Sequence, residues 1–223
     1  MNTYTKYWFL EGFNLFNKLG RITMMRMCEI LEMENINKGE TIQLLKNNEK
    51  SIFFLKKGTI KIIDALNNNV KYIVKKGNIF GELSLYDKQA ALEEQAVALE
   101  DCIICYIEAD RMENIMEKHK SLKNGVLKVY GLRIKKLERR LRDLLYKDSA
   151  LRIEEFIKDY IQEFGEIEEN QIVAKNLLSH KDIANLTNTS RQTVSNVMSC
   201  LRKDDIISYN SQYISIPKKL LPT

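Results

Sequence analysis

Six polar side chains suited to hydrogen bonding with nucleic-acid bases stand close together in the chain: Ser190, Arg191, Gln192, Thr193, Ser195 and Asn196. Arginine can donate two parallel hydrogen bonds to guanine, and the amides of glutamine and asparagine pair with adenine. We therefore expect Arg191 to read guanine, and Gln192 and Asn196 to read adenine. Ser190 and Thr193 are suited to a phosphate or a thymine methyl group. The chemistry indicated is recognition of bases.

Two short amphipathic helices joined by a tight turn would position these side chains. Ser179 and Ser190 each precede a helical pattern, where a serine can accept a hydrogen bond from an amide of the first turn. Asn188 stands where the turn requires a positive φ, which asparagine tolerates. The apolar positions recur at helical spacing: Ile183, Ala184, Leu186, Val194, Val197, Met198 and Leu201. This layout is typical of a helix-turn-helix whose second helix turns the polar set outward.

Two short β-like runs, 206–209 and 213–216, follow the helix pair, with Asn210-Ser211-Gln212 between them. The pattern predicts a hairpin and hence a winged helix-turn-helix. We expect contacts to the DNA backbone from residues around the recognition helix. These are His180, Lys181, Lys203, Ser211 and Gln212. Lys203 is equally consistent with a solvated surface charge.

The run from Asp182-Ile-Ala through Ser190-Arg-Gln-Thr-Val to Ile206-Ile-Ser resembles the C-terminal module of the cyclic-AMP receptor protein (Crp/Fnr) superfamily of bacterial transcription regulators. An αα-hairpin of a helical domain would explain the apolar spacing. It would not explain a cap, a turn, a polar face and a hairpin in this order. The resemblance implies double-stranded DNA as a partner, with RNA polymerase as a further one.

Composition and charge fit this interpretation. With 44% hydrophobic residues among 223, the chain can form one large or two ordinary domains. Its net charge of +5 is uneven: +8 over residues 111–147, −6 over 148–169 and +4 over 170–223. The basic end suits phosphate contact, whereas the acidic stretch would repel DNA. No apolar run approaches the roughly 18 residues of a membrane span, and the first ten residues are unlike a secretion signal. We expect a cytoplasmic protein without a membrane partner.

Residues for catalytic or metal chemistry are sparse. The two histidines, His119 and His180, fall in separate elements, so no Cys/His or Ser/His/Asp arrangement is indicated. Cys102 and Cys105 stand three apart in a strand-like run, where such positions face opposite sides. We interpret the four cysteines as buried thiols in a reducing compartment. The expectation is no enzyme, no metal site and no bound cofactor.

The first half of the chain predicts a β-rich domain. Residues 9–34 are expected to be mainly helical, with an apolar stripe at Phe13, Phe16, Leu19 and Ile22. Short runs rich in β-branched and aromatic residues follow: 41–45, 51–55, 59–64, 70–74, 95–99 and 102–107. Hairpin turns are expected at Gly58, Asn67-Asn68-Asn69 and Gly77. Such spacing is typical of a sandwich or jelly roll.

The run 76–86 resembles the glycine-glutamate-leucine signature of cyclic-nucleotide-binding domains, here Gly81, Glu82 and Leu83. In that family an arginine and a following serine or threonine hold the cyclic phosphate, and those places fall on Leu92 and Glu93. A leucine cannot pair with a phosphate, and a glutamate repels one. We therefore expect cyclic AMP not to be the effector. Glu82 is consistent with a polar role in a different pocket or with a structural role at a turn.

The run Asp110-Arg-Met-Glu113 predicts a capping box, and a longer helix is expected to run to about Tyr146. Its apolar residues are spaced by threes and fours: Leu127, Tyr130, Ile134, Leu137, Leu141 and Leu144. This heptad seam predicts a dimer interface. One helix packed on its own domain would also give an apolar stripe. A hinge is expected at Lys147-Asp148-Ser149, with Ser149 capping a helix that ends at Gly165.

The predicted fold class is α+β: a jelly-roll, cyclic-nucleotide-binding-like sensor over residues 1–108, a dimerisation helix over 109–147 and a winged helix-turn-helix over 148–223. The predicted function is a homodimeric, sequence-specific transcription regulator bound to a near-palindromic operator. The effector is either not cyclic AMP or absent, with the cavity then filled by side chains. The alternative function is a ligand-binding module whose helix-turn-helix docks a protein partner.

Overall fold

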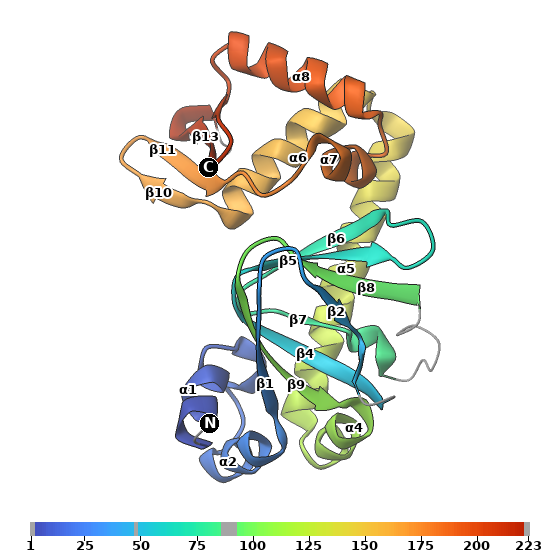
Figure 1. Cartoon of the computed structure of the whole chain (residues 1–223), viewed down its shortest axis with the longest axis vertical. Helices are drawn as coiled ribbons and strands as arrows, with labels where there is room; N and C mark the ends of the chain where they lie inside the picture. The colour runs from blue at the N-terminus through green and yellow to red at the C-terminus, as the bar shows by residue number, and fades with distance from the viewer. Residues whose placement is uncertain (1–2, 47–48, 86–92, 221–223) are drawn as a thin grey trace. The chain divides into compact units, whose positions relative to one another are not determined.

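The computed structural model describes residues 3–46, 49–85 and 93–220 (Figure 1). The chain divides into two compact units, Met1–Lys136 and Leu137–Thr223. The division falls inside one long helix, α5 (Lys120–Tyr146). No helix within the described residues is both long and apolar enough to cross a membrane.

The first unit contains two antiparallel sheets, as the sequence predicted. One sheet orders its strands β1 (Glu32–Ile36), β9 (Cys102–Glu108), β4 (Glu49–Lys57) and β3 (Leu45–Lys46), and β7 (Ile79–Phe80) also pairs with β4. The other orders them β2 (Thr41–Gln43), β8 (Glu94–Ala98), β5 (Thr59–Asp64) and β6 (Val70–Lys75). Apolar side chains of both sheets form a shared core, in which Phe53 and Phe80 stack at 4.8 Å.

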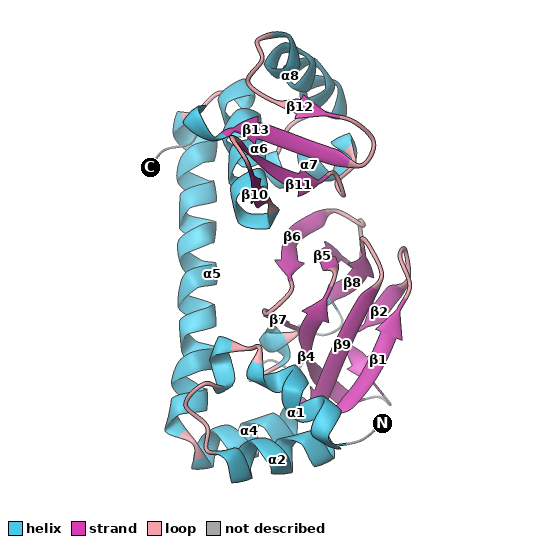
Figure 2. Ribbon diagram, turned by 90° about the vertical axis from the view of Figure 1, so that its left-hand side faces the viewer, coloured by secondary structure: helices cyan, strands magenta, loops and turns pink. Residues whose placement is uncertain are grey.

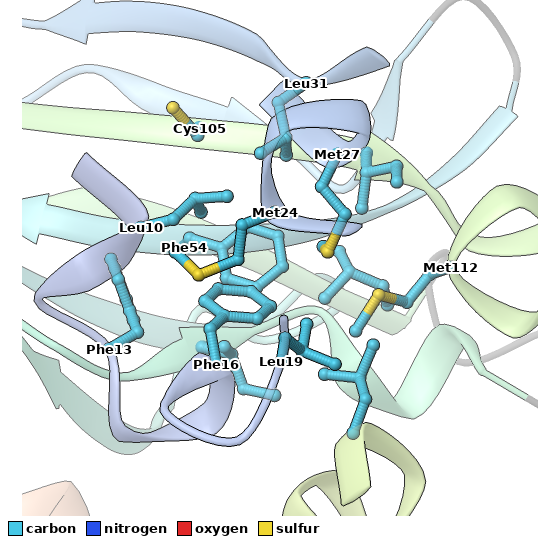
Figure 3. Close-up of a cluster of buried hydrophobic side chains, with 14 of the residues drawn as sticks. Leu10, Phe13, Phe16, Leu19, Met24, Met27, Leu31, Phe54, Cys105 and Met112 are labelled. Atoms are coloured by element: carbon cyan, nitrogen blue, oxygen red, sulfur yellow. The ribbon is translucent and has the colours of Figure 1, made fainter. Parts of the chain in front are cut away.

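Helices cover the other face of the β1-β9-β4 sheet. They are α1 (Thr3–Glu11), the short helix η1 (Asn14–Phe16), α2 (Arg21–Ile30), α4 (Ala109–Lys118) and the start of α5. Figures 1 and 2 show α1, α2 and α4 gathered beside that start. Figure 3 shows the cluster between the helices and the sheet. In it, the ring centroids of Phe16 and Phe54 are 5.2 Å apart. Since β4 is covered on both faces, residues 51–55 are all buried, which explains their continuous apolar run.

The second unit joins a helical core to a small sheet. It contains α6 (Ser149–Phe164), α7 (His180–Thr187) and α8 (Arg191–Lys203). Its sheet orders β10 (Glu166–Glu168), β11 (Gln171–Lys175), β13 (Tyr213–Pro217) and β12 (Ser208–Tyr209), and η3 (Lys218–Leu220) follows. Figure 2 shows this sheet beside α6, whose Ile153, Ile157 and Tyr160 are buried. The helix-turn-helix and the wing are therefore present as predicted.

Several local predictions were wrong. β1 lies partly within the stretch expected to be helical, Ile22 is 73% exposed, and the β10–β11 hairpin was not expected. Helix α4 begins at Ala109 without a side-chain cap, so the capping box at Asp110 does not form. The cap of α6 is Asp148, whose carboxylate accepts from the Leu151 amide at 2.8 Å. An aspartate one residue earlier fills the role assigned to Ser149.

The cysteines follow the expected pattern with one exception. Cys102 lies in the core between the sheets and Cys105 in the cluster under the helices, so the two side chains do face opposite sides. Cys28 is buried as well. Cys200, in contrast, is exposed on α8, because the polar face of that helix has no cover within the described chain.

Candidate nucleic-acid interface

Helix α7 begins with a complete capping box. Ser179 Oγ accepts from the Asp182 amide at 3.1 Å, and Asp182 Oδ2 accepts from the Ser179 amide at 3.0 Å. The helix ends at Asn188, which has a φ of 51°, the left-handed conformation expected there. Both ends are therefore determined by local side-chain chemistry.

Two arginines outside the helix-turn-helix hold the carbonyl end of α7. Arg140 on α5 donates to Asn185 O at 2.8 Å. Arg152 on α6 donates to Thr187 O at 3.1 Å and to Asn188 O at 3.3 Å. Burial lowers the pKa of Arg140, but an arginine remains charged at neutral pH. Cations at a helix C-terminus stabilise its unpaired carbonyls, so these residues fix the turn.

Helix α8 packs one face and exposes the other. Val194, Met198 and Leu201 are buried, and Ser190 caps the helix by accepting from the Thr193 amide at 3.0 Å. The polar set lies on the rest of the helix surface: Arg191, Gln192 and Asn196 are exposed, while Thr193 and Ser195 are half-buried. Gln192 Nε2 donates to Asn196 Oδ1 at 3.0 Å. This bond orients both amides in the same region of the exposed face.

The predicted backbone contacts lie before α8, at its last residue and after it in the chain. Lys181, Lys203, Ser211 and Gln212 are exposed, and His180 is half-buried. The wing turn is held by its own hydrogen bonds, since Asn210 Oδ1 accepts from the Gln212 and Tyr213 amides, both at 2.8 Å. Tyr209 directly precedes this turn, and the Arg202 guanidinium lies 4.9 Å from the centroid of its ring. In sequence, His180 and Lys181 thus come before α8, Lys203 is its last residue, and Ser211 and Gln212 come after it.

The signature region of the first unit forms a tight, buried turn. Gly81 has a φ of +74°, and a Cβ there would lie 2.8 Å from Ser51 O, so glycine is required. Glu82 is 2% exposed and Leu83 is half-buried. Leu92 lies outside the described residues. Glu93 is exposed, whereas its neighbour Glu94 is buried.

The buried carboxylates are balanced by two cations. Arg133 on α5 pairs with Glu82 through Nη1, and its Nη2 lies 3.6 Å from Glu94 Oε1. Lys71 Nζ lies 2.6 Å from the same Glu94 oxygen. The guanidinium of Arg133 stacks on Tyr72 at 3.8 Å from the ring centroid. Glu93, the carboxylate expected to repel a phosphate, is exposed. The buried charge is on its neighbour Glu94, where Lys71 and Arg133 balance it.

Burial and neighbouring charges together shift the pKa values of this cluster. It raises the pKa of Glu82, an effect that Arg133 opposes, and it raises the pKa of Tyr72 well above its usual range. Burial alone would lower the pKa of Arg133, but Tyr72, Glu82 and Glu94 raise it, so the guanidinium stays charged. Among the described residues, no group of three or more His, Cys, Asp or Glu side chains is arranged to hold a metal ion.

Two family models match this chain. A cyclic nucleotide-binding domain matches residues 33–119, and a Crp-like helix-turn-helix domain matches residues 158–220. The two matches occur in the order of the two units, with α5 between them. The chain belongs to the Crp/Fnr superfamily of transcription regulators.

Relatives of this Crp/Fnr regulator span most of its length. The global nitrogen regulator of Synechococcus elongatus is 24% identical over 190 residues, covering 83% of this chain and 86% of that protein. The fumarate and nitrate reduction regulatory protein of Yersinia pestis is 23% identical over 183 residues, covering 81% and 73%. A solved CooA mutant from Carboxydothermus hydrogenoformans has a TM-score of 0.69 at 21% identity, covering 92% of this chain and 88% of that one. The fold is thus shared at low identity.

In this Crp/Fnr regulator, the residues of the predicted dimer seam differ in their exposure. Leu127, Ile134, Leu137 and Leu141 are between 54% and 60% exposed on α5. Leu144 is half-buried. Tyr130 instead packs on its own sandwich, where its hydroxyl donates to Glu82 O. Within the described residues, Leu127, Ile134, Leu137 and Leu141 on α5 are therefore largely uncovered.

The sequence interpretation missed the residues that organise each site from a distance. Arg140, Arg152 and Arg133 come from helices remote in sequence from their partners. One signal was available, because Arg152 is one of two basic residues in the acidic stretch 148–169. Arg133 also stands three residues after Tyr130, which places both side chains toward one side of a helix.

Proposed function

We propose that this Crp/Fnr regulator is a homodimer that binds a near-palindromic operator by placing α8 of each subunit in the major groove. The observation that carries the proposal is the exposed polar face of α8, with Gln192 and Asn196 already bonded to each other. Arg191 reads guanine and the amide pair reads adenine. Phosphates are contacted by the residues before the helix, at its end and after it: His180, Lys181, Lys203, Ser211 and Gln212.

The dimer forms through α5. The exposed leucines at heptad spacing fit a second copy of the same helix, since such a seam buries its apolar side chains only against a partner. Two subunits then place their recognition helices one turn of DNA apart, about 34 Å. Such a regulator acts in the cytoplasm, where the DNA lies, and works together with RNA polymerase.

Cyclic AMP is not the effector in this proposal. In the first unit, Arg133 is paired with Glu82, and Lys71 with Glu94. A cyclic phosphate would need a cation of its own on burial. The regulator therefore responds to a different effector or binds DNA without one.

Duplex binding at increasing salt tests the proposal. The operator would first be located by a genome-wide footprint, and affinity for it and for random duplex would be measured by fluorescence anisotropy. We expect both affinities to fall steeply with salt, because counterions are released, and the operator to bind more tightly throughout. Binding that is indifferent to salt, or equal for the two duplexes, would contradict the proposal.

The dimer is tested by Leu137→Glu, with Leu132→Glu as a matched control. Both leucines are similarly exposed on α5, at 57% and 55%, but only Leu137 lies in the seam. We expect Leu137→Glu to halve the mass measured by light scattering, since two unpaired carboxylates would be buried together. Leu132→Glu should remain dimeric. A monomeric wild type would refute the assignment.

A further inference from the structure

The sensor cluster is formed by four segments: the turn at Glu82, the strands β6 and β8, and the helix α5. Glu82 follows the left-handed Gly81, Lys71 and Tyr72 lie on β6, and Glu94 begins β8. Arg133 reaches this cluster from α5, and its side chain is 19% exposed. The carboxylates of Glu82 and Glu94 and the ring of Tyr72 therefore all lie beside the guanidinium that α5 supplies.

We propose that this site binds a guanidinium group, and that its resident ligand is the Arg133 side chain of the same chain. In this arrangement Arg133 takes the place of a diffusible effector. It holds α5 against the sandwich permanently. The inference deepens the proposed function by naming how the sensor is regulated, and its DNA measurement rests on that function.

Geometry favours a guanidinium over an ammonium. One nitrogen of Arg133 bonds Glu82 and another lies 3.6 Å from Glu94, so the planar fork spans two carboxylates. The flat group also lies 3.8 Å above the Tyr72 ring, a stack that delocalised cations favour. A lysine at position 133 would supply one point charge and no plane.

The charge balance of the described residues disfavours an anionic ligand. Two carboxylates and two cations, Lys71 and Arg133, neutralise each other in the cluster. A phosphate entering this site would add negative charge beside Glu82 and Glu94 or would have to displace one of them into a buried position without a partner. Either arrangement is costly at low local dielectric.

Two bonds tie α5 to the same turn. Arg133 binds the Glu82 side chain, and the Tyr130 hydroxyl donates to the Glu82 carbonyl. Both residues lie within the first unit, on the part of α5 that packs on the sandwich. A ligand shifts an equilibrium only through different affinities for its two states. A ligand that is covalently part of the chain favours the tied state at all times.

Chemical rescue of Arg133→Ala tests the proposal. Removing the side chain leaves an acidic site of guanidinium shape, so thermal unfolding should begin several degrees lower than in the wild type. Millimolar methylguanidinium should restore the midpoint in a saturable manner, whereas tetramethylammonium at the same ionic strength should not. The wild type should respond to neither. Arg139→Ala is the matched control, since its ion pair with Asp159 at 2.5 Å is on the surface; it should show no rescue.

Further readouts keep the inference distinguishable from the proposed function. Operator affinity of Arg133→Ala should fall several-fold and recover with methylguanidinium. If the wild type binds no DNA, the proposed function fails, while the unfolding measurements still decide the sensor. Should Arg133→Ala not fold, Arg133→Lys replaces it, and we expect a lowered midpoint that methylguanidinium does not raise. A variant as stable as the wild type, equal rescue by tetramethylammonium, or wild-type stabilisation by cyclic AMP would overturn the inference.

Discussion

The recognition helix and the sensor cluster use the same kinds of side chain in opposite ways. On α8, Arg191 is exposed and has no ion-pair partner in the described part of the chain. In the sensor, Arg133 is largely enclosed by Glu82, Glu94 and Tyr72. Arg191 is therefore accessible to another molecule, whereas Arg133 is paired with carboxylates of its own chain.

Residue type alone therefore does not identify a binding site. An arginine near a nucleotide-binding signature suggests an anion-binding site. Among the described residues of the sensor, however, Lys71 and Arg133 are each paired with a carboxylate. On α8, Ser190 caps the helix and the Gln192 and Asn196 amides bond each other, whereas the charge of Arg191 is not matched by a carboxylate of the described chain. The number of unmatched charges separates the two regions better than their composition does.

Glu82→Ala should have the largest effect among the variants that test this contrast between the sensor cluster and α8. Removing this carboxylate leaves Arg133 partly buried, with Glu94 as the remaining carboxylate of the cluster. Breaking a buried ion pair costs about 3–5 kcal/mol, and we expect about 3 because Glu94 remains. Denaturant unfolding of the first unit would measure the loss. Glu93→Ala, on the exposed neighbour, should change stability little; equal effects of the two substitutions would show that burial of Glu82 has no energetic consequence.

Arg191→Ala should have the next largest effect, and on DNA binding only. We expect operator affinity to weaken by about 2 kcal/mol and discrimination to relax at one base pair in each half-site, because alanine cannot donate the two hydrogen bonds to guanine. Lys203→Ala is the comparison variant. Removing a phosphate-binding side chain should weaken binding to operator and random duplex alike. If Arg191→Ala weakens binding to both duplexes equally, Arg191 is a phosphate-binding residue as well.

Ser179→Ala should give a smaller loss, of about 1 kcal/mol in the unfolding of the second unit, because the capping box of α7 is removed. Ser208→Ala, on an exposed strand position, serves as the control. The measurement is urea denaturation followed by circular dichroism. A stability unchanged by Ser179→Ala would show that Arg140 and Arg152 are sufficient to hold the helix.

Cyclic nucleotides should neither bind the protein nor change its affinity for the operator. Calorimetric titration with cyclic AMP or cyclic GMP should give no heat of binding, because both cations of the sensor are already paired. Operator affinity should be the same with and without either nucleotide. Micromolar binding accompanied by tighter DNA binding would remove the contrast between the two regions.

The sequence predicted local structure better than remote contacts. The helix-turn-helix was predictable because its caps, turn and apolar period are all encoded within 25 consecutive residues, from Ser179 to Lys203. The strand β1 and the β10–β11 hairpin were missed because they are short and lack a clear alternation. Pairing with distant strands, such as β1 with β9, stabilises such segments where propensity alone is weak.

The sensor could be predicted only in outline. The resemblance indicated the fold and the turn at Glu82, and the acidic character of residues 93 and 94 was visible. The partner of Glu82 was not, since Arg133 lies 51 residues further along the chain. The apolar period of α5 also assigned Tyr130 to the dimer seam, although its hydroxyl bonds the sandwich. Heptad spacing describes one face of a helix and does not specify its partner at each turn.

The distribution of the cysteines gives this protein a natural position for a reporter dye. Burial raises the pKa of Cys102 to about 11 and that of Cys105 to about 12, and it raises the pKa of Cys28 as well. Thiolates, not thiols, react with maleimides, so these three sites are protected in the folded state. Cys200 is exposed near the end of α8. A fluorophore can therefore be attached to the recognition helix of the unaltered chain, where its emission would follow the arrival of DNA in real time.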